Sequence, residues 1–278
     1  MPPAFPDVED VTSALLANNA VVLSVDGIKT FHKCARKYQL QTLRRMRWPA
    51  DTRNFRLGQH VHKLMDYQAY ANLGLPLNAV LPAATNAEKS AFERLEKESS
   101  VAGWPVLASE WGFNLRLSRQ ADWPASVGAV FIRGRMDRLV LQPETHHVVI
   151  VDWKTGTAIP KQPEHDFQTL IYALAVDEAS EHLPVPKQSA LEGAAPRLAF
   201  VYVGVSSNLQ KPLQEIRIDF DAPRLHLARK EVLAEVSAML KAMAADQFAL
   251  PAYCPDRYCP FRTVCGIATQ DSATNLSK

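Results

Sequence analysis

The sequence predicts a mixed α/β protein, in which a helical N-terminal region precedes a group of neighbouring strands and further helices. Three observations predict this class. Apolar residues recur at helical spacing through the N-terminal third, and they alternate with polar residues at a spacing of two over 109–118 and 130–142. A β-branched run then follows at 146–154, as expected for a buried strand.

The N-terminal region is expected to hold three helices, over 24–43, 57–73 and 86–100. Ser24 is a favourable N-cap for the first of them, which places Cys34 in the middle of a helix. The segment 74–85 contains prolines and is expected to be a loop.

The remaining strands and helices follow from the same periodicities. Strands are expected over 109–118, 130–142, 146–154, 197–205 and 213–220. The turn sequence PETH at 143–146 joins the second and third of them into a hairpin. Helices are expected over 163–176 and 223–248, and a Pro- and Ala-rich loop over 183–196.

Composition narrows the class of protein. The chain has 278 residues, 47% of them hydrophobic and 22% charged, and can bury a sizeable core. A formal charge of +2 and a pI near 8.3 permit nucleic-acid binding without arguing for it. The N-terminus is acidic where a secretory signal would be basic, and no long uncharged apolar stretch follows, so we expect a cytoplasmic protein with no membrane partner.

Two acidic residues and a lysine form the clearest chemical pattern. Asp137 lies toward the end of one predicted strand, and Asp152 and Lys154 lie on one face at the end of the next. The hairpin brings Asp137 alongside them, and a divalent cation offsets the repulsion of such a group. Mg²⁺ or Mn²⁺ prefers these oxygen ligands, together with the backbone carbonyl of Trp153, and Lys154 would orient a water or stabilise charge. The alternative is a surface ion pair.

Three of the four cysteines crowd near the C-terminus, as Cys254-x4-Cys259-x5-Cys265, and Cys34 is the fourth. In a cytoplasmic protein this spacing indicates metal binding more than disulfides. Four thiolates suit either structural zinc or a 4Fe-4S cluster. The alternative is four reduced, buried thiols.

Five short motifs occur in a fixed order: Gly58-x-x-x-His62, Glu110, Gly134-x-x-Asp137, Asp152-x-Lys154 and Gln168-x-x-x-Tyr172. Together they resemble the RecB-type branch of the PD-(D/E)XK nucleases, from about Ser24 to Ile267. The resemblance implies a central mixed sheet flanked by helices with an α-β-β-β-α-β core, and hydrolysis of DNA phosphodiester bonds with Mg²⁺ or Mn²⁺. We therefore expect an N-terminal extension over 1–22, one nuclease domain over 23–268 and a disordered tail over 269–278.

The resemblance also assigns roles to residues. His62 would be a metal ligand, since its spacing from Gly58 fits the family and that of His60 does not. Glu110 would support the metal directly or through water; its alternative is a solvated carboxylate at a strand edge. Gln168 and Tyr172 share a helix face and would bind a phosphate or orient the catalytic lysine. Their alternative is an amphipathic helix face with the tyrosine half-buried.

Arg135 shares the strand face of Asp137 and is a candidate phosphate contact in DNA binding. Its alternative is an ordinary surface arginine. Trp48, Tyr67 and Trp111 are candidates for stacking on the bases of a single strand, although each is more often a core residue.

The early segment S-x-D-x-x-K-T-F-x-K-C-A-R-K-Y, with the three late cysteines, is similar to an iron-sulfur subset of this superfamily. That subset includes AddB-type nucleases and CRISPR-adaptation exonucleases, and the resemblance implies a structural 4Fe-4S cluster. The sequence departs from the subset in two places. Four residues, in place of two, separate Cys254 from Cys259, and Ala35 stands where proline is common.

These features predict a stand-alone exonuclease that acts on DNA ends or single strands. No GxxxxGK[ST] helicase motif is present, so unwinding or targeting would come from a helicase, recombination or CRISPR-adaptation partner. A non-catalytic DNA-binding or assembly subunit is the alternative from another class. An enzyme of the same fold that acts on RNA or on structured DNA is the third possibility.

Overall fold

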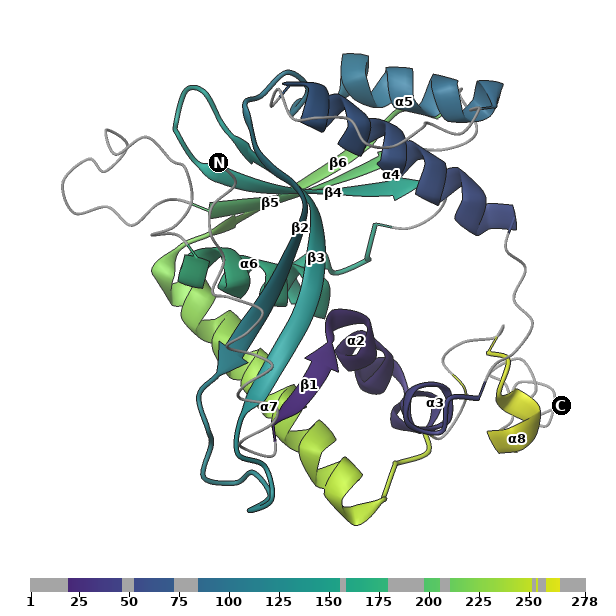
Figure 1. Cartoon of the computed structure of the whole chain (residues 1–278), viewed down its shortest axis with the longest axis vertical. Coiled ribbons are helices and arrows are strands. Elements are labelled where there is room, and N and C mark those ends of the chain that lie inside the picture. Colours follow the sequence, from purple (N-terminus) through teal and green to yellow (C-terminus); the bar gives the residue numbers. More distant parts are fainter. Residues whose placement is uncertain are drawn as a thin grey trace, which may run out of the picture.

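A computed structural model describes residues 20–46, 53–72, 85–155, 159–179, 198–205, 211–251, 254 and 259–265 (Figure 1). Its strands are β1 (Val21–Ser24), β2 (Val106–Leu117), β3 (Val130–Leu141), β4 (Val148–Thr155), β5 (Leu198–Val205) and β6 (Gln214–Phe220). Its longer helices are α2 (Val25–Lys33), α4 (Arg53–Asn72), α5 (Asn86–Glu98), α6 (Phe167–Ala179) and α7 (Ala222–Ala245).

The six strands form one mixed sheet, in the order β1-β3-β4-β5-β6, with β2 paired to β3. The predicted hairpin of β3 and β4 is confirmed, and β2 is antiparallel to β3 as well. β4 and β5 are parallel and joined through α6, which gives the expected α-β-β-β-α-β core. The predicted mixed sheet flanked by helices is therefore confirmed.

Strand β3 shares one of its edges between two partners. Its first residues, 130–133, pair in parallel with β1, and its last residues, 138–141, pair antiparallel with β4. Among the described residues, no strand pairs with 134–137 on this edge. Backbone groups there are left for side chains, so this interval in the sheet is a natural place for a site.

Helices cover both faces of the sheet (Figure 1). On one face α2, α6 and α7 enclose the larger core, in which Ile150 and Phe200 are fully buried. On the other face α4 and α5 cover Val149 and Val201. Because β4 and β5 are buried on both faces, they appear in the sequence as continuous apolar runs without alternation.

The first predicted helix is interrupted, so the placement of Cys34 in mid-helix is wrong. Ser24 does cap α2, accepting a hydrogen bond from Gly27 N at 3.0 Å. Cys34 has an extended backbone, with φ −164° and ψ 103°, and its sulfur accepts from Lys37 N at 3.4 Å. It therefore ends α2 and caps the short helix α3 (Ala35–Tyr38), which continues into the π-helical turn η1 (Gln39–Leu43).

Other boundaries differ in informative ways. The strand β1 was not predicted, and it begins inside the expected extension over 1–22. The predicted helix from Pro163 is a 3-10 turn, η2 (Pro163–His165), followed by α6, because the Asp166 side chain accepts from Gln168 N at 2.9 Å and starts a new helix. A further short helix, α8 (Arg262–Cys265), lies in the cysteine-rich segment. The expected loop over 183–196 lies outside the described residues.

No helix within the described ranges is both long and apolar enough to cross a membrane.

Replacement of Gly134 by alanine is expected to destabilise the protein by about 1–3 kcal/mol. A Cβ at Gly134 would meet the Phe113 ring and lie 2.9 Å from Val25 Cγ2. That ring is held in the core, with its centroid 5.5 Å from the ring of Tyr172. Urea unfolding of the variant measures the effect. Gly112→Ala is the matched control, since a Cβ there meets nothing within 4 Å. Equal stability of the two variants would contradict the prediction.

Candidate functional site

The open interval in β3 holds Asp137. This residue immediately precedes Arg138, which is the first residue of β3 that pairs with β4 and lies opposite Val151. Its Oδ2 accepts a hydrogen bond from Trp153 N at 2.8 Å, so a carboxylate replaces the backbone ladder between the two strands. Asp137 is thereby fixed against the backbone of the Asp152-x-Lys154 motif, as the hairpin prediction required.

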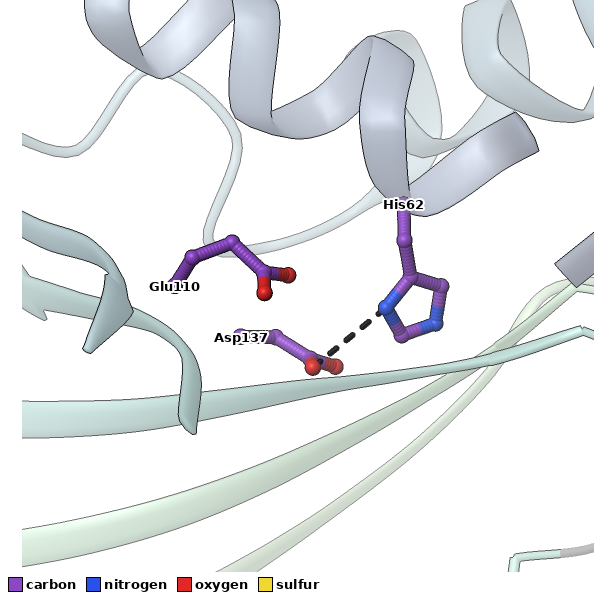
Figure 2. Close-up of side chains that lie close together, drawn as sticks. All are labelled: His62, Glu110 and Asp137. Atoms are coloured by element: carbon purple, nitrogen blue, oxygen red, sulfur yellow. Dashed lines mark ion pairs between the residues drawn. The ribbon is translucent and has the colours of Figure 1, made fainter. Parts of the chain in front are cut away.

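Figure 2 shows His62, Glu110 and Asp137 converging from α4, β2 and β3. One possible ligand atom of each lies within 4.8 Å of the others. His62 Nδ1 is 3.3 Å from Asp137 Oδ1, and His62 Nε2 is 3.0 Å from the carbonyl oxygen of Trp153. The helix and the two strands therefore bring a ring nitrogen and two carboxylates together, while the Trp153 carbonyl of β4 (Val148–Thr155) contacts the other ring nitrogen.

Glu110 reaches this point through an unusual backbone. It lies between the pairs Ser109–Arg138 and Trp111–Met136, directly opposite Asp137, and its φ is +48°. A left-handed residue within a strand is costly for any side chain other than glycine, and such strain concentrates at functional sites. Burial raises the pKa of the Glu110 carboxyl, and Asp137 raises it further against the opposing charge of Arg135.

Asp152 and Lys154 form a buried ion pair beside this group. Lys154 Nζ lies 2.6 Å from Asp152 Oδ2, and Gln168 Nε2 donates to Asp152 Oδ1. Burial and the charge of Asp137 raise the pKa of Asp152, partly opposed by Lys154. Burial lowers the pKa of Lys154, but the carboxylates around it outweigh burial and raise it. Lys154 is therefore a fixed positive charge at neutral pH.

Asp152 is not part of the group in Figure 2, although it was predicted as a metal ligand. Its oxygens face Lys154 and Gln168, while Glu110 occupies the third place in the group. The charge of Asp152 still acts on His62, raising the pKa of that imidazole.

Lys29 is a site residue that the sequence interpretation missed. Its Nζ donates to Gln168 Oε1 at 2.9 Å and lies 3.2 Å from Asp166 Oδ1. Lys154 Nζ lies 3.4 Å from the same Gln168 oxygen, so two lysines fix the orientation of this amide. Lys29 is the lysine of the S-x-D-x-x-K-T-F segment, which precedes Cys34. Its membership of that segment could have identified it as a candidate site residue.

Tyr172 is buried, and its hydroxyl donates to the carbonyl oxygen of Arg135 at 2.5 Å. It thus satisfies one backbone group in the open interval of β3 and does not face solvent. The Arg135 side chain is 69% exposed, and its Nε lies 3.0 Å from Glu110 Oε2. Tyr172 therefore supports the strand, while the Arg135 side chain is exposed to solvent beside Glu110.

The remaining candidates are His60, Trp111, Tyr67 and Trp48. His60 Nδ1 lies 2.6 Å from Glu88 Oε1 of α5, so the preference for His62 over His60 agrees with the geometry. Trp111 is only 4% exposed and packs against Phe113, so it cannot stack on a base. Tyr67 is half-buried on α4, and Trp48 lies outside the described residues.

Three of the four cysteines gather around one small apolar cluster, and Cys34 is a neighbour of one of them, Cys265. Cys259 is buried with Leu40 of η1 and Phe261, and Cys254 and Cys265 pack against them. Burial raises the pKa of the Cys265 thiol, and the neighbouring Cys34 and Cys254 raise it further. None of the four forms a disulfide. The fold therefore joins the segment after α2 to the C-terminal cysteines.

A family model of the PD-(D/E)XK nuclease superfamily matches residues 22–266, which is most of the chain. The chain belongs to this superfamily. Its fold is similar to that of a candidate exonuclease from Eubacterium rectale, with a TM-score of 0.50 and 15% identity over 87% of this chain and 88% of that one. At this identity the likeness concerns the fold. No curated protein matches the chain in sequence.

The nuclease superfamily uses divalent metals, and the residues in Figure 2 fit one. Carboxylate and carbonyl oxygens are the ligands that Mg²⁺ and Mn²⁺ prefer. One possible ligand atom of each of His62, Glu110 and Asp137 lies within 4.8 Å of the others, so these three residues would hold the ion.

The affinity of this nuclease for Mn²⁺ is expected to rise from about pH 6.5 to about pH 8 and then level off. Burial lowers the pKa of His62, but Asp137, Asp152 and the Trp153 carbonyl outweigh burial and raise it to about 8. A metal must displace that proton. Protonated His62 correspondingly stabilises the metal-free fold below about pH 6.5, and this contribution is lost as pH rises through about 8.

Isothermal titration calorimetry across this range measures both the affinity and the proton released. His62→Ala should bind Mn²⁺ roughly ten-fold more weakly at about pH 8 and lose the pH dependence. His60→Ala removes an imidazole two residues away that is paired with Glu88, and this variant should behave as wild type. An affinity that does not change with pH in the wild type would contradict this prediction.

Proposed function

We propose that the chain is a Mg²⁺- or Mn²⁺-dependent deoxyribonuclease that hydrolyses phosphodiester bonds, acting as an exonuclease on DNA ends or single strands. The observation that supports this proposal most strongly is that the His62, Glu110 and Asp137 group lies beside the Asp152–Lys154 ion pair. One nuclease domain spans 23–268 in this proposal.

The site residues have two roles: some would bind the metal, and the others position a charged group beside it. His62, Glu110 and Asp137 would hold the cation, together with Asp152 and the Trp153 carbonyl once these turn toward it. When bound, a divalent cation supplies Lewis acidity and positive charge for phosphodiester hydrolysis.

Lys154 would act through its charge. Its raised pKa keeps it protonated, so it orients the attacking water or stabilises charge on the phosphate and does not serve as a base. Gln168 holds both members of the ion pair in place, donating to Asp152 and lying 3.4 Å from the ammonium. Lys29 positions Gln168 in turn. Such pre-set geometry is what phosphoryl chemistry needs from side chains.

We further propose that Cys34, Cys254, Cys259 and Cys265 hold a structural 4Fe-4S cluster, as in the RecB-like iron-sulfur nucleases. Four thiolates suit either structural zinc or a 4Fe-4S cluster, and the resemblance to the iron-sulfur subset favours the cluster. Its role would be structural, since hydrolysis requires no electron transfer from it.

The proposed setting is the cytoplasm, with DNA as partner and a helicase, recombination or CRISPR-adaptation protein supplying unwinding or targeting. The alternative, a non-catalytic DNA-binding subunit, would not require a buried carboxylate and lysine 2.6 Å apart beside a second carboxylate group. The left-handed backbone at Glu110 also favours an enzyme, since a binding subunit gains nothing from that strain.

The decisive test is cleavage of end-labelled single- and double-stranded DNA by anaerobically purified protein. Mononucleotide release from one end with Mg²⁺ or Mn²⁺, and none after chelation by EDTA, would support the exonuclease. Internal cuts in circular DNA would support an endonuclease instead. A well-folded, metal-loaded protein that binds but cleaves neither substrate would favour the non-catalytic subunit. RNA of the same sequence separates a ribonuclease from a deoxyribonuclease.

A further inference from the structure

One face of the β2–β3 ribbon leads outward from the metal group. In an antiparallel pair, alternate residues of both strands lie on the same face, and opposed residues are neighbours. The face begins at Glu110 and Asp137 and continues through three opposed pairs: Gly112 with Arg135, Asn114 with Arg133, and Arg116 with Phe131. We call this set the ribbon face.

The ribbon face is basic, and it is exposed at its three arginines but not at Phe131, which is 6% exposed. The side chains of Arg116, Arg133 and Arg135 all lie in solvent. Arg133 Nε donates to Asn114 Oδ1 at 3.1 Å, and within the described ranges no carboxylate is paired with Arg133 or Arg116. Two positive charges therefore stand unneutralised beyond Arg135, which itself contacts Glu110 of the metal group.

The opposite face of the same ribbon is core. Phe113, Leu115 and Ile132 are buried there, under α7 and its neighbours. Fold stability therefore explains one face and leaves the arginines of the other unexplained. The surface beside Arg135 is also open at Gly112, where a Cβ would meet no atom within 4 Å.

We propose that the ribbon face binds the sugar-phosphate backbone of the substrate strand as it leads away from the scissile bond. This inference rests on the proposed nuclease function and adds the path of its substrate. Alternate residues of a strand are about 6.8 Å apart, comparable to successive phosphates of an extended single strand. Arg135, Arg133 and Arg116 would thus contact consecutive phosphates, while the metal group receives the bond to be cut.

The order of the pairs supports this direction. Carboxylates that attract a cation stand at one end, and guanidinium groups that bind phosphates stand beyond them. Asn114, between Arg133 and Arg116, adds an amide that can reach a sugar or phosphate oxygen. An acidic protein partner would satisfy the same charges, so the test uses nucleic acid alone.

The test compares two substrates in the same preparations: a single-stranded oligonucleotide, and bis(p-nitrophenyl) phosphate, which is too small to reach beyond the metal group. Arg116→Ala combined with Arg133→Ala should raise KM for the oligonucleotide roughly ten-fold and leave the small diester unaffected. The salt dependence of log KM should fall by about 1.4, from about 0.7 for each lost phosphate contact.

Gly112 offers a pair of variants with opposite charge at an open position. Gly112→Glu should raise KM for the oligonucleotide roughly five-fold, and Gly112→Lys should lower it by a similar factor. Because a Cβ at Gly112 meets no atom within 4 Å and the position is exposed, both variants should fold, and thermal unfolding checks this. Lys89→Ala combined with Lys230→Ala, on α5 and α7, removes the same charge from elsewhere and should change nothing.

Two failures are distinguishable. If the wild type cleaves neither substrate with Mn²⁺, the proposed function is wrong. If the wild type cleaves both, and the arginine and Gly112 variants match the lysine control in KM and salt dependence, the nuclease stands and the ribbon path is overturned.

Discussion

Asp152→Asn is expected to lower kcat for DNA cleavage by about 10³-fold while leaving the protein folded. Asp152 is 3% exposed, and asparagine has its shape, so the core packing is retained. The substitution removes the charge that holds Lys154 at 2.6 Å and that acts on the metal group. A rate measured at saturating DNA and Mn²⁺ isolates this loss from weaker binding.

The same variant should be destabilised by less than the roughly 3–5 kcal/mol that is typical when one partner of a buried ion pair is removed. Burial raises the pKa of Asp152, so its ionised form costs free energy in the folded state; this cost is complete above about pH 6 and disappears as pH falls from about 6 to the lower unfolded pKa. Asparagine removes this cost but leaves Lys154 without its closest partner. Urea unfolding at neutral pH measures the net effect.

Asp177→Asn provides the control, since this exposed residue lies on α6 away from the ion pair. It should retain the activity and stability of the wild type. If Asp152→Asn kept more than a tenth of the wild-type kcat, the assignment of the catalytic centre to the Asp152–Lys154 pair would be wrong.

Periodicity sufficed for most of the fold because local sequence determined it. The buried runs of β4 and β5 and the cap at Ser24 were readable directly. The four residues of β1 were not, because their strand conformation depends on pairing with β3. The break at Cys34 was equally hidden, since an extended residue between two helical segments leaves the apolar spacing of the sequence unchanged.

In the candidate site, too, some features follow from local sequence and others depend on tertiary contacts. Alternation along a strand placed Asp152 and Lys154 together, and the hairpin brought in Asp137. The contact of Lys29 with Gln168 depends on how α2 packs against α6, which periodicity cannot give. The left-handed backbone of Glu110 is likewise a tertiary effect, because nothing in its neighbours favours that conformation.

Cys34 has two roles in the structure, and two substitutions separate them. Its sulfur caps α3, and it is the N-terminal member of the cysteine group. Serine is a good N-cap and a poor ligand for iron, whereas alanine is neither. Cys34→Ser should therefore lose iron and sulfide while keeping α3, and Cys34→Ala should lose both.

If the cysteines hold a cluster, both Cys34 variants should be destabilised by roughly 3–5 kcal/mol, because the bound cluster closes a very long loop in the unfolded chain. The alanine variant should be the less stable by about 1 kcal/mol, the value of the cap. Iron, sulfide and zinc analysis of anaerobic protein, with electron paramagnetic resonance after reduction, measures the loss. Because α2 carries both Lys29 and the approach to Cys34, DNA cleavage should fall with the cluster. A serine variant with wild-type stability and metal content would show that Cys34 serves only as a cap.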